Sequence, residues 1–125
     1  MDYEVKIIEC SKELKARERL FVKDTSDAIR LDTATAEGEI IITPEYYAIL
    51  GVHNEKSDDV DYSTYVIVDV GGNKFVTGSD SFFKSFIEIY NEMVNEDEDY
   101  SIKAYRLESK NYKGKTFITC SIVNE

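Results

Sequence analysis

The sequence predicts a mainly β protein, an OB-fold-like five-stranded barrel with one amphipathic helix between its third and fourth strands. Three observations lead to this fold class. Several short segments are rich in β-branched and aromatic residues, and glycine-containing turns separate them. One segment, at about residues 80–95, instead repeats its apolar residues at helical spacing. The 125 residues suffice for one domain spanning 1–125, in which residues 1–19 form a charged extension that packs partly at most.

The strand signals begin weakly and then strengthen. Leu-Phe-Val at residues 20–22 predicts a short strand, followed by a turn and a second apolar group at residues 28–31. Residues 40–53 give the strongest β signal, and Pro44 within them indicates a sheet edge or a bend. The alternation predicts that one face carries Ala48, Leu50 and Val52 and the other carries Tyr47, Ile49 and His53.

A hairpin and the helix come next. The sequence "YSTYVIVDVGGNKFVTGS" predicts a strand to Val70, a turn at residues 71–73 and a return strand through residues 75 and 76. Ser79 with Asp80 predicts a helix start. The helix has two adjoining apolar rows, which predict that it lies over a sheet: Phe82, Phe86, Ile89 and Met93, and Phe83, Ile87, Tyr90 and Val94.

The chain finishes with two strand segments, "YSIKAYRL" and "TFITCSIV", joined by the polar turn "ESKNYKGK". If the two strands pair, Lys103, Tyr105 and Phe117 share one solvent-facing surface beside the lysine-rich turn. The single helix after the third strand favours the OB-type barrel over other α+β folds.

Composition excludes several classes of protein. No apolar run approaches the roughly 18 residues of a membrane span, and the acidic N-terminus does not resemble a signal peptide. We therefore expect a cytoplasmic protein that does not bind membranes. Two separated cysteines, Cys10 and Cys120, are expected to be free thiols in that compartment.

No catalytic or cofactor motif is present. One histidine and two cysteines cannot supply the four ligands of a structural zinc site. The pair Gly71-Gly72 precedes a strand rather than a helix, so it does not predict a phosphate-binding loop. The acidic run at residues 96–99 has the pattern of a solvated loop rather than a calcium site. We expect neither an enzyme nor a cofactor or metal.

Charge is distributed unevenly. The formal net charge is −10, yet residues 101–125 carry five Lys or Arg against two Asp or Glu. Lysines interleaved with aromatic residues suit single-stranded nucleic acid, because cations meet phosphates and flat rings stack on unpaired bases. A lysine-rich turn also serves solubility alone. The candidate residues of this terminal region are Lys103, Tyr105, Arg106 and Phe117 on the strands and Lys110, Tyr112, Lys113 and Lys115 in the turn.

Strand parity alone adds Tyr47, His53 and Tyr65 as further candidate contacts. Each candidate has a structural alternative: Phe117 packs on a neighbouring strand, and His53 packs or meets water at a strand end.

The order of these segments resembles that of small single-stranded-DNA-binding proteins encoded by tailed phages and prophages of Gram-positive bacteria. The resemblance covers about residues 20–123, with a "TGS" helix start and "SKNYKGKTF" before the final strand. It implies an OB-fold that binds single strands without sequence preference and coats and protects them in phage DNA replication or recombination. Residue by residue, it points to Lys110, Tyr112, Lys113 and Lys115.

The resemblance also implies partners. Single-stranded DNA in the cytoplasm of a bacterial host cell is the first, phage or host replication proteins are further ones, and a homo-oligomer is left open. The sequence ends at "SIVNE", without the long acidic tail by which bacterial housekeeping versions recruit partners. We therefore expect another surface, such as the loop at residues 96–99, to take that role.

A second function belongs to a different class. The net charge of −10 and the clustered acids of residues 80–100 also suit an acidic phage-encoded protein that mimics DNA and inhibits a host nucleic-acid enzyme. The cationic final hairpin argues against it, because a mimic gains nothing from lysines there.

Overall fold

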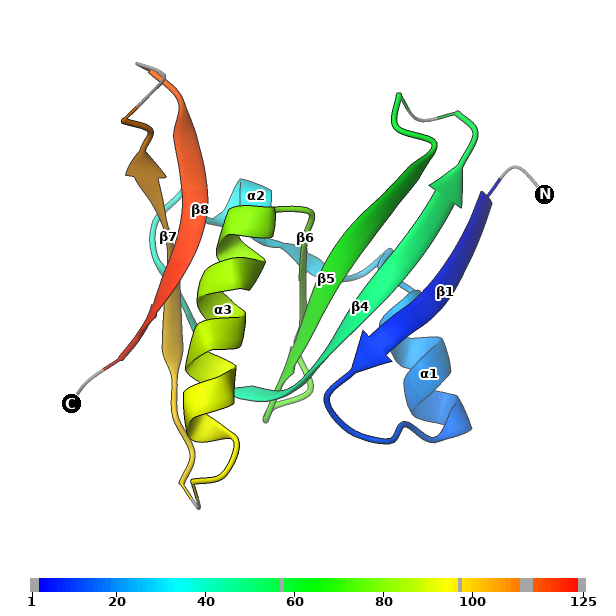
Figure 1. Cartoon of the computed structure of the whole chain (residues 1–125), viewed down its shortest axis with the longest axis horizontal. Helices are drawn as coiled ribbons and strands as arrows, with labels where there is room; N and C mark the ends of the chain where they lie inside the picture. Colours follow the sequence, from blue (N-terminus) through cyan, green and yellow to red (C-terminus); the bar gives the residue numbers. More distant parts are fainter. Residues whose placement is uncertain (1–2, 57, 97, 111–113, 124–125) are drawn as a thin grey trace. The chain divides into compact units, whose positions relative to one another are not determined.

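The computed structural model describes residues 3–56, 58–96, 98–110 and 114–123. It is mainly β (Figure 1). Its elements, in chain order, are β1 (Tyr3–Cys10), α1 (Ala16–Lys23), β2 (Ile29–Arg30), α2 (Leu31–Ala34), β3 (Ile40–Ile42), β4 (Pro44–Asn54), β5 (Asp61–Asp69), β6 (Lys74–Thr77), α3 (Asp80–Met93), β7 (Ile102–Glu108) and β8 (Thr116–Ile122).

These elements form two compact units. Unit 1 comprises Met1–Ile29 and Glu45–Gly78, and unit 2 comprises Arg30–Pro44 and Ser79–Glu125. The strands form a five-stranded sheet in the order β1-β4-β5-β6-β2 and a three-stranded sheet in the order β3-β7-β8. The mainly β class is therefore confirmed. Neither sheet closes on itself within the described residues, so the OB-type barrel stays a prediction. Whether residues 1–125 fold as a single domain stays a prediction.

Unit 1 is built on the predicted alternation of β4. Ala48, Leu50 and Val52 are buried in one apolar cluster, as predicted. Two residues outside the sheet, Leu14 and Val22, complete it. Pro44 marks a bend, because β3 ends one residue before Thr43 and β4, one residue after it, belongs to the other sheet. The single strand expected over residues 40–53 is therefore two strands.

The β5–β6 hairpin has the predicted turn, with β5 ending at Asp69 rather than Val70. The Asp69 carboxylate accepts hydrogen bonds from the backbone N–H of Gly71 at 3.0 Å and of Asn73 at 2.7 Å. Gly72 has φ +84°, a conformation that favours glycine. An aspartate and a glycine thus fix the chain reversal between the two strands.

The strand predicted at residues 20–22 is wrong, because these residues lie in helix α1. Ala, Arg, Glu, Leu and Lys around them are good helix formers. The Glu18 carboxylate also accepts a 3.0 Å hydrogen bond from the Lys15 backbone N–H, which satisfies one donor at the helix start. Only Val22 of α1 is fully buried. The apolar trio is therefore one buried residue and two exposed neighbours.

The expected extension at residues 1–19 instead contains an element of the sheet. Strand β1 pairs antiparallel with β4, from Tyr3 opposite Asn54 to Cys10 opposite Ala48. Val5 and Ile7 pack against the cluster of unit 1, while Glu4 and Lys6 are exposed. The charged side chains occupy one face of a strand whose other face is apolar.

Unit 2 is a small sheet with helix α3 along strand β8 (Figure 1). The Ser79 hydroxyl accepts a 3.2 Å hydrogen bond from the Phe82 N–H, so the predicted helix start is confirmed. Phe82 and Phe86 are fully buried and their rings stack at a centroid distance of 6.4 Å. The Ser81 hydroxyl donates a 2.9 Å hydrogen bond to the Ile118 carbonyl of β8. No helix of the described residues has the length and apolar character needed to cross a membrane.

Candidate nucleic-acid interface

The β7–β8 hairpin brings together the strand residues that the sequence singled out. Lys103 lies opposite Ser121, and Leu107 lies opposite Phe117. Tyr105, midway between them on β7, lies on the same side of the sheet, because alternate residues of a strand share a face. The predicted common surface of Lys103, Tyr105 and Phe117 is thus confirmed as a matter of register. We call the surface formed by Ile41, Lys103, Tyr105, Leu107 and Phe117 the hairpin face.

The hairpin face carries large apolar side chains in water. Phe117 is 37% exposed, Leu107 is 44% exposed, and Ile41 of β3, opposite Lys103, is 56% exposed. Leu107 and Phe117 lie directly opposite each other, so two exposed apolar side chains are neighbours on this face. The alternative for Phe117, packing on a neighbouring strand, is met only in part, since Leu107 opposes it and both remain exposed.

Tyr105 is held in place at the centre of this face. Its hydroxyl lies 2.8 Å from the Ser121 hydroxyl, and the Lys103 ammonium lies 5.6 Å from the centroid of its ring. A cation at this distance is attracted to the ring, so Lys103 and Tyr105 each stabilise the position of the other side chain. A fixed aromatic ring beside a cation is the arrangement on which an unpaired base and its phosphate bind.

The turn between β7 and β8 is described only at its two ends. The Ser109 N–H donates a 2.8 Å hydrogen bond to the Lys115 carbonyl, which brings the exposed residues Lys110 and Lys115 to the base of one loop. Gly114 has φ +80° there. The candidates Tyr112 and Lys113 lie outside the described residues. Of the predicted lysine cluster, the structure thus describes only Lys110 and Lys115, at the two ends of the loop.

Arg106 does not belong to the hairpin face. It alternates with Tyr105, and its Nη1 donates a 2.9 Å hydrogen bond to the Thr116 hydroxyl while Nη2 donates to the Asp32 carbonyl in α2. Its buried Nε has no hydrogen-bond partner in the described structure. The guanidinium links α2 to the β7–β8 hairpin, and these hydrogen bonds argue against the predicted contact of Arg106 with nucleic acid.

The three candidates from strand parity lie in unit 1, and Tyr47 is not a surface residue. Its side chain is 6% exposed, and its hydroxyl donates a 2.9 Å hydrogen bond to Glu9. Its backbone N–H donates to the Ser11 hydroxyl at 2.9 Å. Tyr47 therefore anchors the end of β1, and its burial argues against the predicted contact with nucleic acid. Tyr65, opposite Thr77, is half-buried.

His53 lies among carboxylates. Its Nδ1 is 2.8 Å from Asp61 and its Nε2 is 3.9 Å from Glu55. The hydrogen bond to Asp61 raises the pKa of His53, and the charges of Asp61, Glu55 and Glu4 raise it further. A phosphate approaching this imidazole meets negative charge first. The surroundings of His53 therefore argue against the predicted contact with nucleic acid.

His53 lines a shallow groove that the sequence did not predict. The groove has a volume of about 610 Å³ and lies on the outer face of β1, β4 and β5. Its lining includes Glu4, Lys6, Ile8 and Gly51. The alternation of apolar and charged residues in "YEVKIIEC" was the signal for this face, but the charges made the segment resemble an extension. Within the described residues no three His, Cys, Asp or Glu side chains come close enough to hold a metal ion.

No protein-family model, no curated protein and no solved structure matches the chain significantly.

Proposed function

We propose that the protein binds single-stranded DNA without sequence preference, through the hairpin face and the loop at residues 109–115. The observation that carries the proposal is the β7–β8 register, which puts Lys103, Tyr105 and Phe117 on one surface beside the exposed ends of the loop. On this proposal the protein coats single strands in phage replication or recombination inside a bacterial cell. It acts without catalysis or a cofactor.

The physical terms of binding follow from that surface. Each base stacked on a ring contributes about 1–3 kcal/mol, and Tyr105 and Phe117 offer two rings. On a single strand, each neutralised phosphate makes the slope of the logarithm of the binding constant against the logarithm of the salt concentration more negative by about 0.7. Lys103, Lys110 and Lys115 then act against a net charge of −10. We expect weak binding by one protomer, strong salt dependence and a gain in affinity when protomers coat a strand together.

The OB-type barrel belongs to this proposal. In it, β3 and β4 together are the first strand, β5 and β6 the second and third, and β7 and β8 the fourth and fifth. Helix α3 then follows the third strand, as the barrel requires. Oligonucleotides bind OB-folds partly at the loop between the fourth and fifth strands. That loop is residues 109–115, so the barrel and the hairpin face support the same site.

The experiment is a titration with oligothymidine, read by quenching of tyrosine fluorescence at low and high salt. The test variant combines Lys103→Glu with Phe117→Ala, and the matched control is Lys84→Glu, an exposed lysine of α3 in the same unit. We expect the test variant to bind at least tenfold more weakly, since one stacked base alone accounts for about 1–3 kcal/mol. Equal binding by the test variant and the wild type would refute the proposal, and so would binding that ignores salt.

The second candidate function is an acidic protein that mimics DNA. The carboxylates around His53 and the exposed Glu96, Glu98 and Asp99 favour it. Changing Lys110, Lys113 and Lys115 together to Glu separates the two functions. A single-strand binder loses oligothymidine, whereas a mimic binds none before or after the change and keeps its target.

A further inference from the structure

Strand β1 leaves one side of the larger sheet open. It is the outermost strand in the order β1-β4-β5-β6-β2, and within the described residues no strand pairs with its other side. It is also longer than the other outermost strands, with eight residues against two in β2, three in β3 and seven in β8. Helix α3 lies along β8, so β1 is the long edge that stays open. An open edge presents backbone donors and acceptors that favour pairing with another strand.

The regular part of this edge is defined by a bulge. The pairing of β1 with β4 shifts by one residue between Ile7 and Glu9, so Ile8 is the extra residue. Ile8 is 64% exposed and lies over Gly51, where an added Cβ would be 2.8 Å from the Ile8 Cδ1. The segment that remains straight and regular is Tyr3–Ile7, and its centre is Val5.

We propose that two copies of this chain associate through their β1 strands, antiparallel and centred on Val5. A two-fold axis perpendicular to the sheet relates the two copies, so both have the same face on the same side of the joined sheet. Directly opposed residues of antiparallel strands have their side chains on one face, so the residue at the axis must lie opposite the same residue of the second copy. With Val5 at the centre, Glu4 of each copy faces Lys6 of the second copy, and Tyr3 faces Ile7. The inference is independent of the proposed function.

Charge selects this register among its neighbours. A centre at Glu4 would place two carboxylates opposite each other, and a centre at Lys6 would place two ammonium groups opposite each other. Like charges directly opposed across strands are destabilising, and opposite charges are stabilising. A centre at Ile7 would run through the bulge. Only the centre at Val5 gives two opposed ion pairs and uses the regular segment alone.

The side chains on both faces of the joined sheet are also compatible with this register. Val5 and Ile7 pack against the apolar cluster of their own unit, and Tyr3 is 52% exposed on the same side. Pairing sets Val5 against Val5 and Tyr3 against Ile7, which continues the apolar row from one copy to the next. Glu4 and Lys6, which form an exposed 3.7 Å ion pair within one copy, lie on the other side. Association then replaces that solvent-exposed pair with two pairs across the interface.

The experiment measures mass by sedimentation equilibrium from about 1 to about 500 μM full-length protein, a range that reports a micromolar Kd. We expect the wild type to dimerise. Glu4→Lys and Lys6→Glu should each raise the dimer Kd about tenfold, because each sets like charges opposite each other twice. Lys84→Glu on α3 makes the same charge change as Lys6→Glu away from β1 and should leave the Kd unchanged. Circular dichroism confirms that the exposed substitutions retain the fold.

The decisive arm is rescue. The double variant Glu4→Lys with Lys6→Glu restores opposite charges in this register, and so does an equal mixture of the two single variants. Both should dimerise within about twofold of the wild type. A wild type that stays monomeric at about 500 μM would overturn the proposal, because Glu4 and Lys6 would then protect the edge. Single variants that dimerise normally, or a double variant without rescue, would overturn the register.

Discussion

The two units differ in the contacts that attach a helix to their sheet. In unit 2, helix α3 contributes a strong apolar face, with Phe82 and Phe86 fully buried and the Ser79 hydroxyl at its start. In unit 1, helix α1 buries only Val22, and a charged side chain attaches it to the sheet. That side chain is Lys74 of β6, 4% exposed, whose ammonium donates to the Phe21 carbonyl at 2.5 Å and to the Asp24 carbonyl. One helix is held by apolar packing, and the other by a buried cation at its C-terminal end.

The difference explains which helix the sequence could reveal. An apolar face repeats at a fixed spacing and is visible in the sequence alone. A helix held by one lysine from a distant strand has no such pattern, since residues 21 and 74 are 53 positions apart. The following experiments test whether the two helices depend on these different contacts.

Removing an aromatic ring from α3 should have the largest effect. Phe86 is 1% exposed, and Phe86→Ala should lower the free energy of unfolding by about 3–5 kcal/mol through lost burial and a cavity. Urea unfolding followed by circular dichroism measures it. Val94→Ala, at the end of the adjoining apolar row and 49% exposed, should change stability by less than about 0.5 kcal/mol. A similar loss from both variants would contradict the packing described for α3.

Removing the cation that holds α1 should have the next largest effect. Lys74→Met keeps the aliphatic stem but leaves the carbonyls of Phe21 and Asp24 without their donor. We expect a loss of about 2 kcal/mol, because hydrogen bonds to a buried charge are strong. Hydrogen exchange should become faster in α1 and stay unchanged in α3. Lys23→Met, in the last turn of α1 and exposed, is the matched control.

The cap of α3 should contribute less than its rings. Ser79→Ala removes the acceptor of the Phe82 N–H and should cost about 1 kcal/mol, whereas Ser79→Asp keeps an acceptor and should cost little. Thermal unfolding of the two variants measures the difference. Equal melting temperatures would mean that the cap does not stabilise the helix.

The smallest effect is one of pH, and it belongs to unit 1. The hydrogen bond to Asp61 raises the pKa of His53 above its ordinary value of 6.5. Protonated His53 therefore stabilises the fold fully below about pH 6.5, and this contribution is lost as the pH rises through the folded pKa. His53 is the one histidine of the sequence, so its NMR titration is unambiguous. Asp61→Asn should lower the pKa and weaken the pH dependence, and an unchanged titration would contradict the pairing.

Much of the fold could be predicted from local pattern. The β5–β6 hairpin, the start of α3, the β7–β8 pairing and the buried face of β4 all follow from alternation, turn residues and caps. The break at Thr43 was predictable only in part, because strand signals lie on both sides of it and alternation does not show that they enter two different sheets. The bend was signalled only by Pro44, whose missing N–H fits a strand end as well as an edge.

The candidate site was predictable only where parity and exposure agree. Lys103, Tyr105 and Phe117 share a face as predicted, because register follows from the alternation of both strands. Parity does not say which faces are covered, so Tyr47 was assigned to the surface although it is buried beside Glu9. The partner of Arg106 was not predictable for another reason: the carbonyl of Asp32 is 74 residues away and carries no sequence signal.

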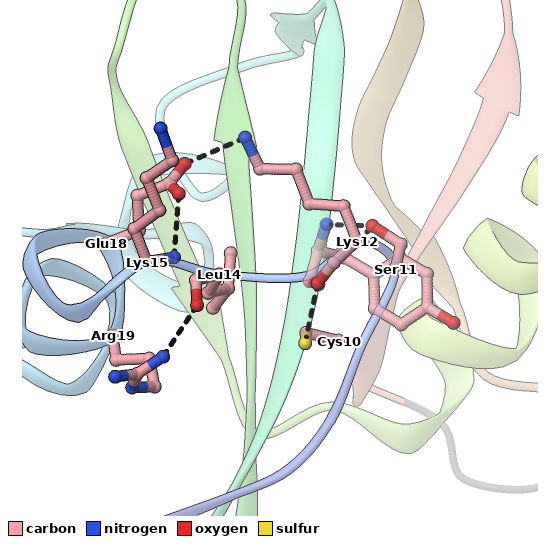
Figure 2. Close-up of polar contacts among 8 residues, drawn as sticks. Cys10, Ser11, Lys12, Leu14, Lys15, Glu18 and Arg19 are labelled. Atoms are coloured by element: carbon pink, nitrogen blue, oxygen red, sulfur yellow. Dashed lines mark hydrogen bonds and ion pairs between the residues drawn. The ribbon is translucent and has the colours of Figure 1, made fainter.

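The two cysteines are free, and each unit contains one of them: Cys10 at the end of β1 and Cys120 within β8. The Cys10 thiol, at the edge of the sheet, donates to the Lys12 carbonyl at 2.9 Å (Figure 2). Burial raises the pKa of the Cys120 thiol to about 12, so the reactive thiolate is almost absent at neutral pH. Alkylation of Cys120 should therefore require local opening of β8. Mass spectrometry of the two alkylated peptides would then report the rate of local opening in each unit without any introduced label.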